Sequence, residues 1–327
     1  MDIKTRILKE LKNTDTYVSG QDICEKCGVS RTAVWKVINQ LKNEGYEIDS
    51  VTNKGYKIIE TPDILSKSEI ESVIEDGSIV KDIIYFDETD STNTRAKLLG
   101  EEGAVSGTLV VADCQNMGKG RRGRSFSSPA GQSIYMTLLL RPDTSPSKAS
   151  MITILSAMAV RSALSEVCGI EGLIKWPNDI VADGKKLCGI LTEMSAELTK
   201  INYVVVGIGI NVNNEKMPED IEKIAVSARM LTGKKQKRSL IIGSVCKWFS
   251  IYYNKFIETS DLSLLKDEYN RYLIHMNKEV EIIRDNEKYR AKSLGLADDG
   301  ELLIERDGKP ETVMSGEVSV RGVYGYV

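Results

Sequence analysis

The spacing of hydrophobic residues changes twice along this 327-residue chain. Up to about residue 61 the hydrophobic residues recur mainly at helical intervals. From about residue 62 to 277, helical and strand-like segments alternate. After residue 277, only short strand-like segments follow. The chain is also too long for one ordinary core, since domains typically hold roughly 100 to 200 residues. We therefore expect three domains, over residues 1–61, 62–277 and 278–327.

The first domain is predicted to be a winged helix-turn-helix. Residues 3–11 place their apolar side chains on one helical face, a second helix runs from Ser19 to near Gly28, and Ser30 caps a third. Residues 46–59 then read as a β-hairpin. Three helices followed by a hairpin are the elements of a winged helix.

One face of this domain is predicted to bind DNA. Residues 1–60 contain ten Lys or Arg and nine Asp or Glu, so the domain as a whole is nearly neutral. The stretch 31–42, however, holds three basic residues and no acidic one, as recognition-helix docking on phosphates requires. The predicted DNA contacts are Ser30, Arg31, Thr32, Trp35, Lys36 and Lys54. The alternative is a winged helix that contacts only other proteins.

The second domain is predicted to be a mixed sheet packed with helices. Strands are expected over residues 83–86, 108–114, 133–140, 173–175, 179–182, 187–194 and 203–212, and helices near 91–100, 147–168, 239–259 and 261–276. A hairpin turn at Asp183–Gly184 indicates antiparallel neighbours. Closely spaced turns after Asn277, with no helical pattern, predict a small SH3-like β-barrel. The fold class is therefore α+β.

Composition excludes several classes of protein. Hydrophobic residues make up 41% of the chain and charged residues 28%, as in a soluble globular protein. Apolar runs such as 203–210 are far shorter than the ~20 residues of a membrane helix, and the N-terminus does not resemble a signal peptide. The six cysteines are mostly isolated, and the Cys24–Cys27 pair lacks the second pair that a zinc site needs. We expect a cytoplasmic protein without a metal site of its own.

The single histidine, His275, excludes most histidine-based chemistry. Catalytic triads, HExxH zinc sites and histidine acid–base pairs would all depend on that one residue, which lies near a predicted domain boundary. We therefore expect His275 to be structural. Catalysis then depends on Lys, Arg, carboxylates and backbone groups, which favours phosphate or adenylate chemistry.

The segment GKGRRGRSF, residues 118–126, is the most informative motif. It matches G-x-G-x-x-G, but a turn and a strand follow it where a dinucleotide fold needs a helix, and no Gly-Lys-Ser/Thr completes a P-loop. What remains is a glycine-rich loop with four cations close together, which repel unless an anion neutralises them. An anionic ligand is therefore predicted there, in preference to a merely solvated basic loop.

Three further motifs are ambiguous when taken singly. Lys175 ends a strand in KWPNDI, and the ordinary alternative to a functional role is a solvated surface lysine. The glycines in residues 204–213 permit close approach of a ligand, but they also suit a β-bulge. Ser91–Asn93 follow a strand and could be helix caps only.

In order, however, the motifs S-T-N, Gln115 with GKGRRGR, KWPND, KLCGIL and GIGINVN closely resemble the catalytic domain of biotin protein ligases. The resemblance covers residues 80–215 by motif and extends by pattern through SGEVSVRG at 315–322. With the winged helix, the chain is similar to the bifunctional biotin ligases and biotin operon repressors. Lys119 and Phe126 stand where many members carry arginine and tryptophan.

The resemblance implies a role for each matched position. Lys175 and Arg121 would be catalytic. The biotin-binding residues would be Ser91, Thr92, Asn93, Gln115, Lys119, Gly120, Arg121, Lys175, Ile180 and Gly207. The nucleotide-binding residues would be Arg121, Arg122, Arg124, Phe126, Lys175, Asn178 and Asn211.

The resemblance also implies the reaction and the partners. Biotin and ATP, with Mg²⁺ on the ATP, would give biotinyl-5'-AMP, and biotin would pass to a lysine of a biotin carboxyl carrier protein of acetyl-CoA carboxylase or a related carboxylase. Biotinyl-5'-AMP would also act as corepressor for binding to the operator DNA of biotin genes. The loaded protein would be a homodimer through its central sheets, with no membrane contact.

Two alternatives stay open at this point. A lipoate or octanoate ligase or transferase would share the fold, although Gln115 and the S-T-N set favour a ureido group. A biotin-sensing transcription factor without catalysis is the second, although it would not need to retain Lys175, Arg121 and Asn211 together.

Overall fold

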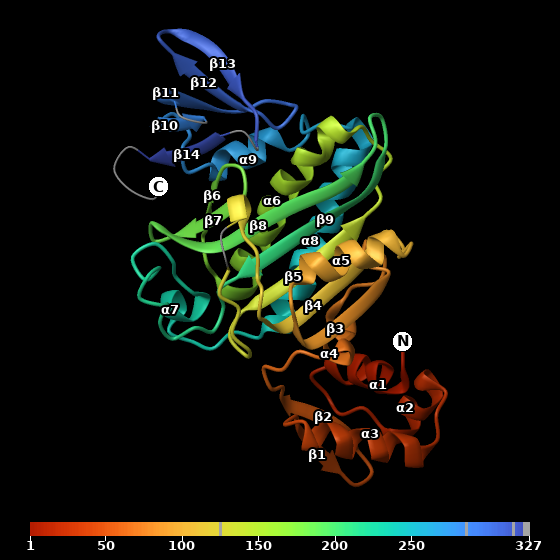
Figure 1. Ribbon diagram of the computed structural model, residues 1–327. Helices are drawn as coiled ribbons and strands as arrows, with labels where there is room; N and C mark the ends of the chain where they lie inside the picture. The colour runs from red at the N-terminus through yellow and green to blue at the C-terminus, as the bar shows by residue number, and fades with distance from the viewer. Residues whose placement is uncertain (124–125, 285–286, 316–317, 323–327) are drawn as a thin grey trace. The chain divides into compact units, whose positions relative to one another are not determined.

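The computed structural model describes residues 1–123, 126–284, 287–315 and 318–322. The chain divides into two compact units. Unit 1 comprises Met1–Asp76 with Lys237–Gly243, and unit 2 comprises Gly77–Gln236 with Ser244–Val327. Figure 1 shows the helices and strands of both.

Unit 1 is the predicted winged helix with one added helix. It contains α1 (Ile3–Lys12), α2 (Gly20–Cys27), α3 (Arg31–Asn43), β1 (Glu47–Val51), β2 (Gly55–Glu60) and α4 (Lys67–Val73). The Ser19 and Ser30 hydroxyls cap α2 and α3 by accepting hydrogen bonds from backbone N–H groups three residues on. Strands β1 and β2 pair antiparallel, with Asn53 at a φ of 65° in the turn. The sequence did not predict α4.

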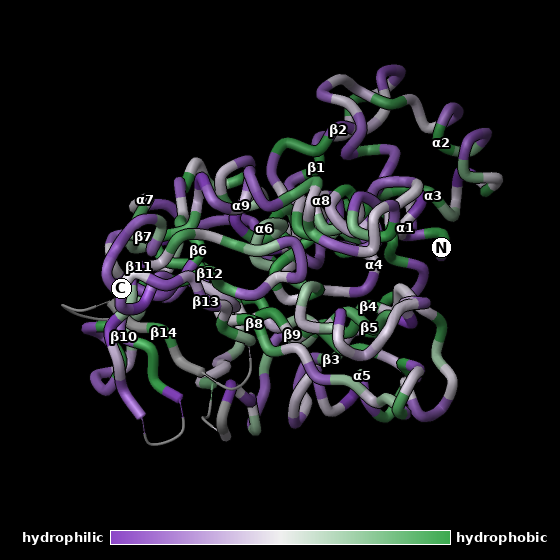
Figure 2. Tube along the Cα trace, turned by 90° about the horizontal axis from the view of Figure 1, so that it is seen from above, coloured by the Kyte–Doolittle hydropathy of each residue, from purple (hydrophilic) through white to green (hydrophobic). Residues whose placement is uncertain are grey.

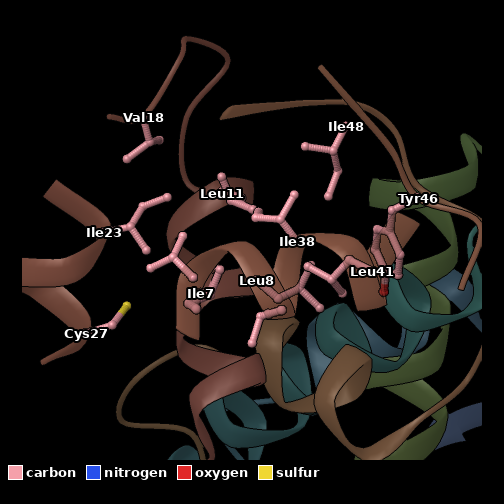
Figure 3. Close-up of a cluster of buried hydrophobic side chains, with 12 residues drawn as sticks. Ile7, Leu8, Leu11, Val18, Ile23, Cys27, Ile38, Leu41, Tyr46 and Ile48 are labelled. Atoms are coloured by element: carbon pink, nitrogen blue, oxygen red, sulfur yellow. The ribbon is translucent and has the colours of Figure 1, made fainter. Parts of the chain in front are cut away.

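The core of unit 1 is built from the apolar faces that the periodicity predicts. Ile7, Leu8 and Leu11 of α1 are at most 1% exposed, and Figure 3 shows them beside Ile38 and Leu41 of α3. Val34 and Val37 of α3 are also buried. This packing leaves the remaining face of α3 to solvent.

Unit 2 contains a seven-stranded sheet in the order β3-β4-β5-β9-β8-β7-β6. Strands β3 and β4 run parallel and all other neighbours antiparallel, so the sheet is mixed as predicted. The strands are β3 (Asp82–Thr89), β4 (Thr108–Gln115), β5 (Ile134–Leu140), β6 (Leu173–Lys175), β7 (Asp179–Ala182), β8 (Lys185–Ala196) and β9 (Ile201–Ile210).

Helices cover both faces of this sheet. Helix α5 (Thr92–Glu101) packs its Ala96 against β4, β5 and β9. Helix α6 (Ala149–Cys168) lies on the opposite face, where Thr153 donates a hydrogen bond to Thr192 of β8. The other helices are α7 (Ala228–Thr232), α8 (Arg238–Thr259), which begins in unit 1, and α9 (Lys266–Tyr272). Figure 2 shows the hydropathy of the same elements.

Helix α6 together with the short turn before it, Pro146–Cys168, is long and apolar enough to cross a membrane. The sequence was expected to contain no segment of this kind. Because 78% of its most apolar stretch is buried within the protein, it serves here as a core helix.

The last part of unit 2 is a five-stranded antiparallel sheet in the order β13-β12-β11-β10-β14. Its strands are β10 (Glu279–Arg284), β11 (Glu287–Leu296), β12 (Leu302–Arg306), β13 (Lys309–Val313) and β14 (Val318–Gly322). Trp176 joins it to the larger sheet region by donating to the carbonyl of Gly300. The predicted α+β class is confirmed.

Candidate active site

A cavity of about 520 Å³ opens on the seven-stranded sheet of unit 2. Its size suits a small-molecule ligand. Of the predicted site residues it brings together Ser91, Thr92, Asn93, Gln115, Lys119, Gly120, Arg121, Phe126, Lys175, Asn178 and Gly207. These residues come from α5, β4, the glycine-rich loop, the β6–β7 turn and β9, so the fold gathers motifs that are far apart in the sequence.

One end of the cavity is lined by hydroxyls and amides. Ser91 is the N-cap residue of α5, yet its side chain makes no capping hydrogen bond, so the interpretation as a mere helix cap is wrong for it. Gln115 accepts hydrogen bonds at Oε1 from the backbone N–H (2.8 Å) and the hydroxyl (3.1 Å) of Thr92. Its amide nitrogen donates to Ser128 at 3.0 Å. An amide nitrogen carries two protons, so among the described residues one N–H of Gln115 remains for a ligand.

Gly207 and Gly209 of β9 leave room for two side chains over the sheet. A Cβ at Gly207 would lie 2.0 Å from Oδ1 of Asn93, and one at Gly209 would lie 2.8 Å from the ring of Phe126. Both distances are far below van der Waals contact. The glycines in GIGINVN are therefore required by Asn93 and Phe126, in addition to lining the cavity.

Cationic side chains lie around the cavity. Lys175 is 7% exposed at the end of β6, and Arg121 donates from Nη1 to Oδ1 of Asn178 at 2.8 Å. Asn178 is fixed in turn by donating to the carbonyl of Ile190 at 3.0 Å. Asn178 therefore aims the Arg121 guanidinium. Such fixed cations suit a ligand that carries phosphate or carboxylate groups.

The glycine-rich loop closes on itself. The backbone N–H of Phe126 donates to the carbonyl of Gly118 at 2.9 Å. A Cβ at Gly118 would lie 2.4 Å from the carbonyl oxygen of Phe126, so only glycine fits at this closure. Lys119, Gly120 and Arg121 consequently face the cavity from one tight loop.

Two predicted residues do not line the cavity. Ile180 is fully buried in β7, and Asn211, which follows β9, donates to the carbonyl of Val226 at 3.2 Å. Arg124 and the side chain of Arg122 lie outside the described residues.

The cavity is also lined by residues that were not predicted from the sequence. Asp179 and Lys186 form an ion pair at 2.8 Å beside Lys175 and Asn178. Further lining residues are Tyr135, Trp176, Pro177, Gly189, Ile190, Leu191, Ile208, Gly209, Ile224 and Val320. The motif KLCGIL, which begins at Lys186, was the available signal for β8. Val320 lies on β14 of the C-terminal sheet, and it lines the cavity because of how that sheet packs, for which the sequence offers no local signal.

The structure agrees with a structural interpretation of His275. The side chain is 2% exposed, and burial, followed by the charges of Lys175 and Lys278, lowers its pKa to about 4. The imidazole is therefore neutral at neutral pH.

The predicted DNA-binding residues lie on the solvent side of unit 1. Trp35 is 61% exposed, and Arg31, Thr32 and Lys36 of α3 are exposed with it. Ser30 is committed to capping α3, and the Lys54 ammonium lies 5.8 Å from the ring centroid of Tyr17. The exposed face of α3 thus carries basic side chains, which phosphate contact requires, together with the exposed Trp35.

Three family models match the chain. Residues 85–211 match the biotin/lipoate A/B protein ligase family, residues 4–57 an HTH domain, and residues 275–321 the biotin protein ligase C terminal domain. The bifunctional ligase/repressor BirA of Bacillus subtilis is 38% identical over 306 residues, which are 93% of this chain and 94% of that protein. The protein of the same name from Escherichia coli is 28% identical over 98% of this chain and 97% of its own.

A solved structure shares the arrangement of the catalytic unit. It is described as a biotin protein ligase from Aquifex aeolicus in complex with biotin and ATP. It matches with a TM-score of 0.66 and 33% identity, and the match covers 74% of this chain and 99% of that one.

Proposed function

The chain belongs to the bifunctional ligase/repressor family of biotin protein ligases, and from this premise we propose how its cavity performs the ligation. It is a biotin protein ligase that uses ATP, and it carries a repressor domain. The observation that carries the proposal for the site is the pairing of a hydroxyl- and amide-lined end with a cationic end in one cavity.

The ureido ring of biotin fits the polar end. A cyclic urea has one carbonyl acceptor and two N–H donors, and the free N–H of Gln115 together with the hydroxyl of Ser91 can satisfy the carbonyl. The apolar part of the bicycle and the valeryl chain would lie along Leu191, whose side chain shares the sheet face of Gly207. Biotin would then point its carboxylate toward Lys175.

Lys175 and Arg121 would carry out the first half-reaction by electrostatics. The biotin carboxylate attacks the α-phosphate of ATP, the bond to pyrophosphate breaks, and negative charge moves to the leaving group. The two anions repel each other, so fixed cations are needed to hold both and to stabilise the transition state. Arg121, aimed by Asn178, and Lys175 at the strand end would supply this charge.

Magnesium would arrive with the nucleotide. Among the described residues, no group of three or more His, Cys, Asp or Glu side chains is placed to hold a metal ion. Mg²⁺ prefers phosphate oxygens and water, which ATP and solvent provide.

In the second half-reaction, a lysine amine of a carrier protein attacks the mixed anhydride, and AMP leaves. The anhydride must be kept from water until that amine arrives. The loop that closes between Gly118 and Phe126 lies at the cavity and is the segment suited to cover it. We propose a biotin carboxyl carrier protein of a carboxylase as the acceptor, with both proteins in the cytoplasm.

Biotin-dependent exchange of labelled pyrophosphate into ATP tests this function without a carrier protein. We expect the intact protein to catalyse the exchange with biotin and not with lipoate or octanoate, because the amide and hydroxyl set of the cavity suits a ureido ring. Exchange with lipoate alone would assign the chain to lipoate ligation. No exchange with any acid would make it a sensor without catalysis.

We also propose that unit 1 binds operator DNA, with biotinyl-5'-AMP as corepressor. One winged helix covers one half-site, so repression would require a homodimer, which we place at the edge of the central sheet. The exposed Trp35 and Lys36 on α3 support α3 as the element that enters the major groove.

Operator binding is expected to tighten when biotin and ATP are added together. Fluorescence anisotropy with a fragment upstream of the biotin-synthesis genes of the source genome measures it. Lys36→Ala is expected to weaken binding and to reduce the salt slope by about 1, because one phosphate contact is lost. Lys26→Ala is the control, because Lys26 lies on α2 instead of α3 and is paired with Glu10 of α1. Equal affinity with and without the adenylate would contradict the corepressor role.

A further inference from the structure

Asn93 is held by three groups, the cavity-lining Leu191 and two residues that do not line the cavity, Thr137 and Glu193. Its side chain is buried and lies under the polar end. Oδ1 accepts from the Thr137 hydroxyl at 2.7 Å. Nδ2 donates to the carbonyl of Leu191 at 3.2 Å and to Oε2 of Glu193 at 2.8 Å. Neither Thr137 nor Glu193 belongs to any motif described above.

These bonds leave Asn93 only one kind of contact for a ligand. A side-chain amide has two N–H donors and one oxygen with two lone pairs. Leu191 and Glu193 use both donors, and Thr137 uses one lone pair. Toward the cavity Asn93 can therefore only accept a hydrogen bond.

The orientation of the amide depends on Glu193 and on the Leu191 carbonyl. If the Asn93 amide turned by 180°, its oxygen would face two groups that can only accept, and both contacts would become repulsive. Thr137 does not prevent that turn, because a hydroxyl can donate or accept. The carboxylate and the Leu191 carbonyl together fix which end of Asn93 faces the cavity.

Glu193 is kept as a carboxylate by its surroundings. Its Oε1 lies 2.8 Å from the ammonium of Lys97 one turn further along α5. Burial raises its pKa, but the hydrogen bonds from Lys97 and Asn93 and the charges of Lys97 and Lys119 outweigh this, so the pKa lies below its usual value.

The sheet register makes this arrangement rigid. Thr137, Gly207 and Leu191 are direct partners across β5, β9 and β8, so their side chains share one face, and Glu193 follows on that face two residues after Leu191. The 2.0 Å between a Cβ at Gly207 and Asn93 Oδ1 shows that the amide lies directly on the strand.

We propose that Glu193, held by Lys97, is the specificity-determining residue that keeps Asn93 an acceptor toward the cavity and so selects a ligand ring that presents an N–H there. The inference rests on the proposed binding of biotin, whose ureido ring carries two such groups. Replacing the ureido N–H that donates to Asn93 by a ring oxygen would place that oxygen against the Asn93 oxygen, and both can only accept.

The test compares biotin with the two analogues in which one or the other ureido N–H is replaced by oxygen. Pyrophosphate exchange gives kcat and KM for each ligand with the intact protein and with Glu193→Gln. A glutamine can donate to the turned amide and so leaves only the Leu191 carbonyl to oppose the turn; the preference for biotin over one of the analogues is therefore expected to fall about tenfold. The change should appear in KM, with kcat nearly constant and the second analogue unaffected.

Two further variants separate specificity from general damage. Thr137→Val removes a donor without allowing the amide to turn, so the KM values of biotin and the analogues should rise together and their ratios stay constant. Lys97→Met leaves Glu193 in place without its cation, so the preference for biotin over the affected analogue should fall by a smaller factor than in Glu193→Gln. The Lys97 variant also tests the inference if Glu193→Gln does not fold. Unchanged ratios in both the Glu193 and Lys97 variants would overturn the inference, whereas an intact protein without biotin-dependent exchange would overturn the proposed function instead.

Discussion

Lys175→Met is expected to slow biotin-dependent pyrophosphate exchange by about 10²- to 10³-fold, which corresponds to roughly 3 to 4 kcal/mol of lost transition-state stabilisation. Methionine keeps the length of the side chain and removes the charge that would hold the carboxylate and the α-phosphate together. Because Lys175 is 7% exposed, solvent cannot replace that charge easily. Steady-state exchange rates over a range of biotin and ATP concentrations measure the effect.

The form of the loss distinguishes two roles for Lys175. A group that acts only in the transition state lowers kcat and kcat/KM equally, whereas one that binds substrate and transition state alike raises KM alone. We expect the first pattern. Lys185→Met is the matched control, because Lys185 lies in the same sheet at the start of β8, donates to the carbonyl of Glu222 and does not line the cavity. An exchange rate in Lys175→Met within a few-fold of the control would contradict the catalytic role.

The elements with strong local signals could be predicted from the sequence. Strands 173–175 and 179–182 match β6 and β7 to the residue, because Pro177 and the Asp183–Gly184 turn bound them. The last predicted helix was too long: residues 261–276 were expected and α9 covers Lys266–Tyr272. Asp261 caps a separate turn through Ser263, and Leu273 leaves the helix to bridge with Ile174 of β6. A tertiary contact therefore ends this helix, and local periodicity contains no sign of it.

In the site, too, residues with a local sequence signal could be predicted, and residues placed by tertiary contacts could not. Residues in contiguous motifs, such as Gln115 and Lys175, were predicted together and line one cavity. Thr137 and Glu193 were not, because their relation to Asn93 depends on the register of β5 and β8 across β9. Val320 enters from a separate sheet. The sequence of a strand shows which of its residues share a face. Which residues lie opposite them on the neighbouring strand depends on the strand order, and these motifs do not encode that order.

A buried ion pair within unit 1 carries the other large expected effect. Asp63 and Arg238 are about 3% and 2% exposed, and Nε of Arg238 lies 3.2 Å from Oδ2 of Asp63. The Asp63 carboxylate also accepts from the backbone N–H of Arg238 at 3.0 Å, at the first residue of α8. Arg238→Met leaves that carboxylate buried without its cation, which typically costs about 3 to 5 kcal/mol.

Hydrogen exchange measures this cost where it arises. A chain of two units does not unfold as a single two-state system, so a global transition would mix their stabilities. Amides in α1 and α3 are expected to exchange about 10²- to 10³-fold faster in Arg238→Met, since each 1.4 kcal/mol of local opening free energy is tenfold. The double variant Arg238→Met with Asp63→Asn should recover much of the loss, because it removes the unpaired charge as well. Lys26→Met, at an exposed pair with Glu10, should change the same amides little. If the Arg238 and Lys26 variants exchanged alike, the buried pair would contribute no more than a surface one, and the packing around α8 would have to hold this end of unit 1 by itself.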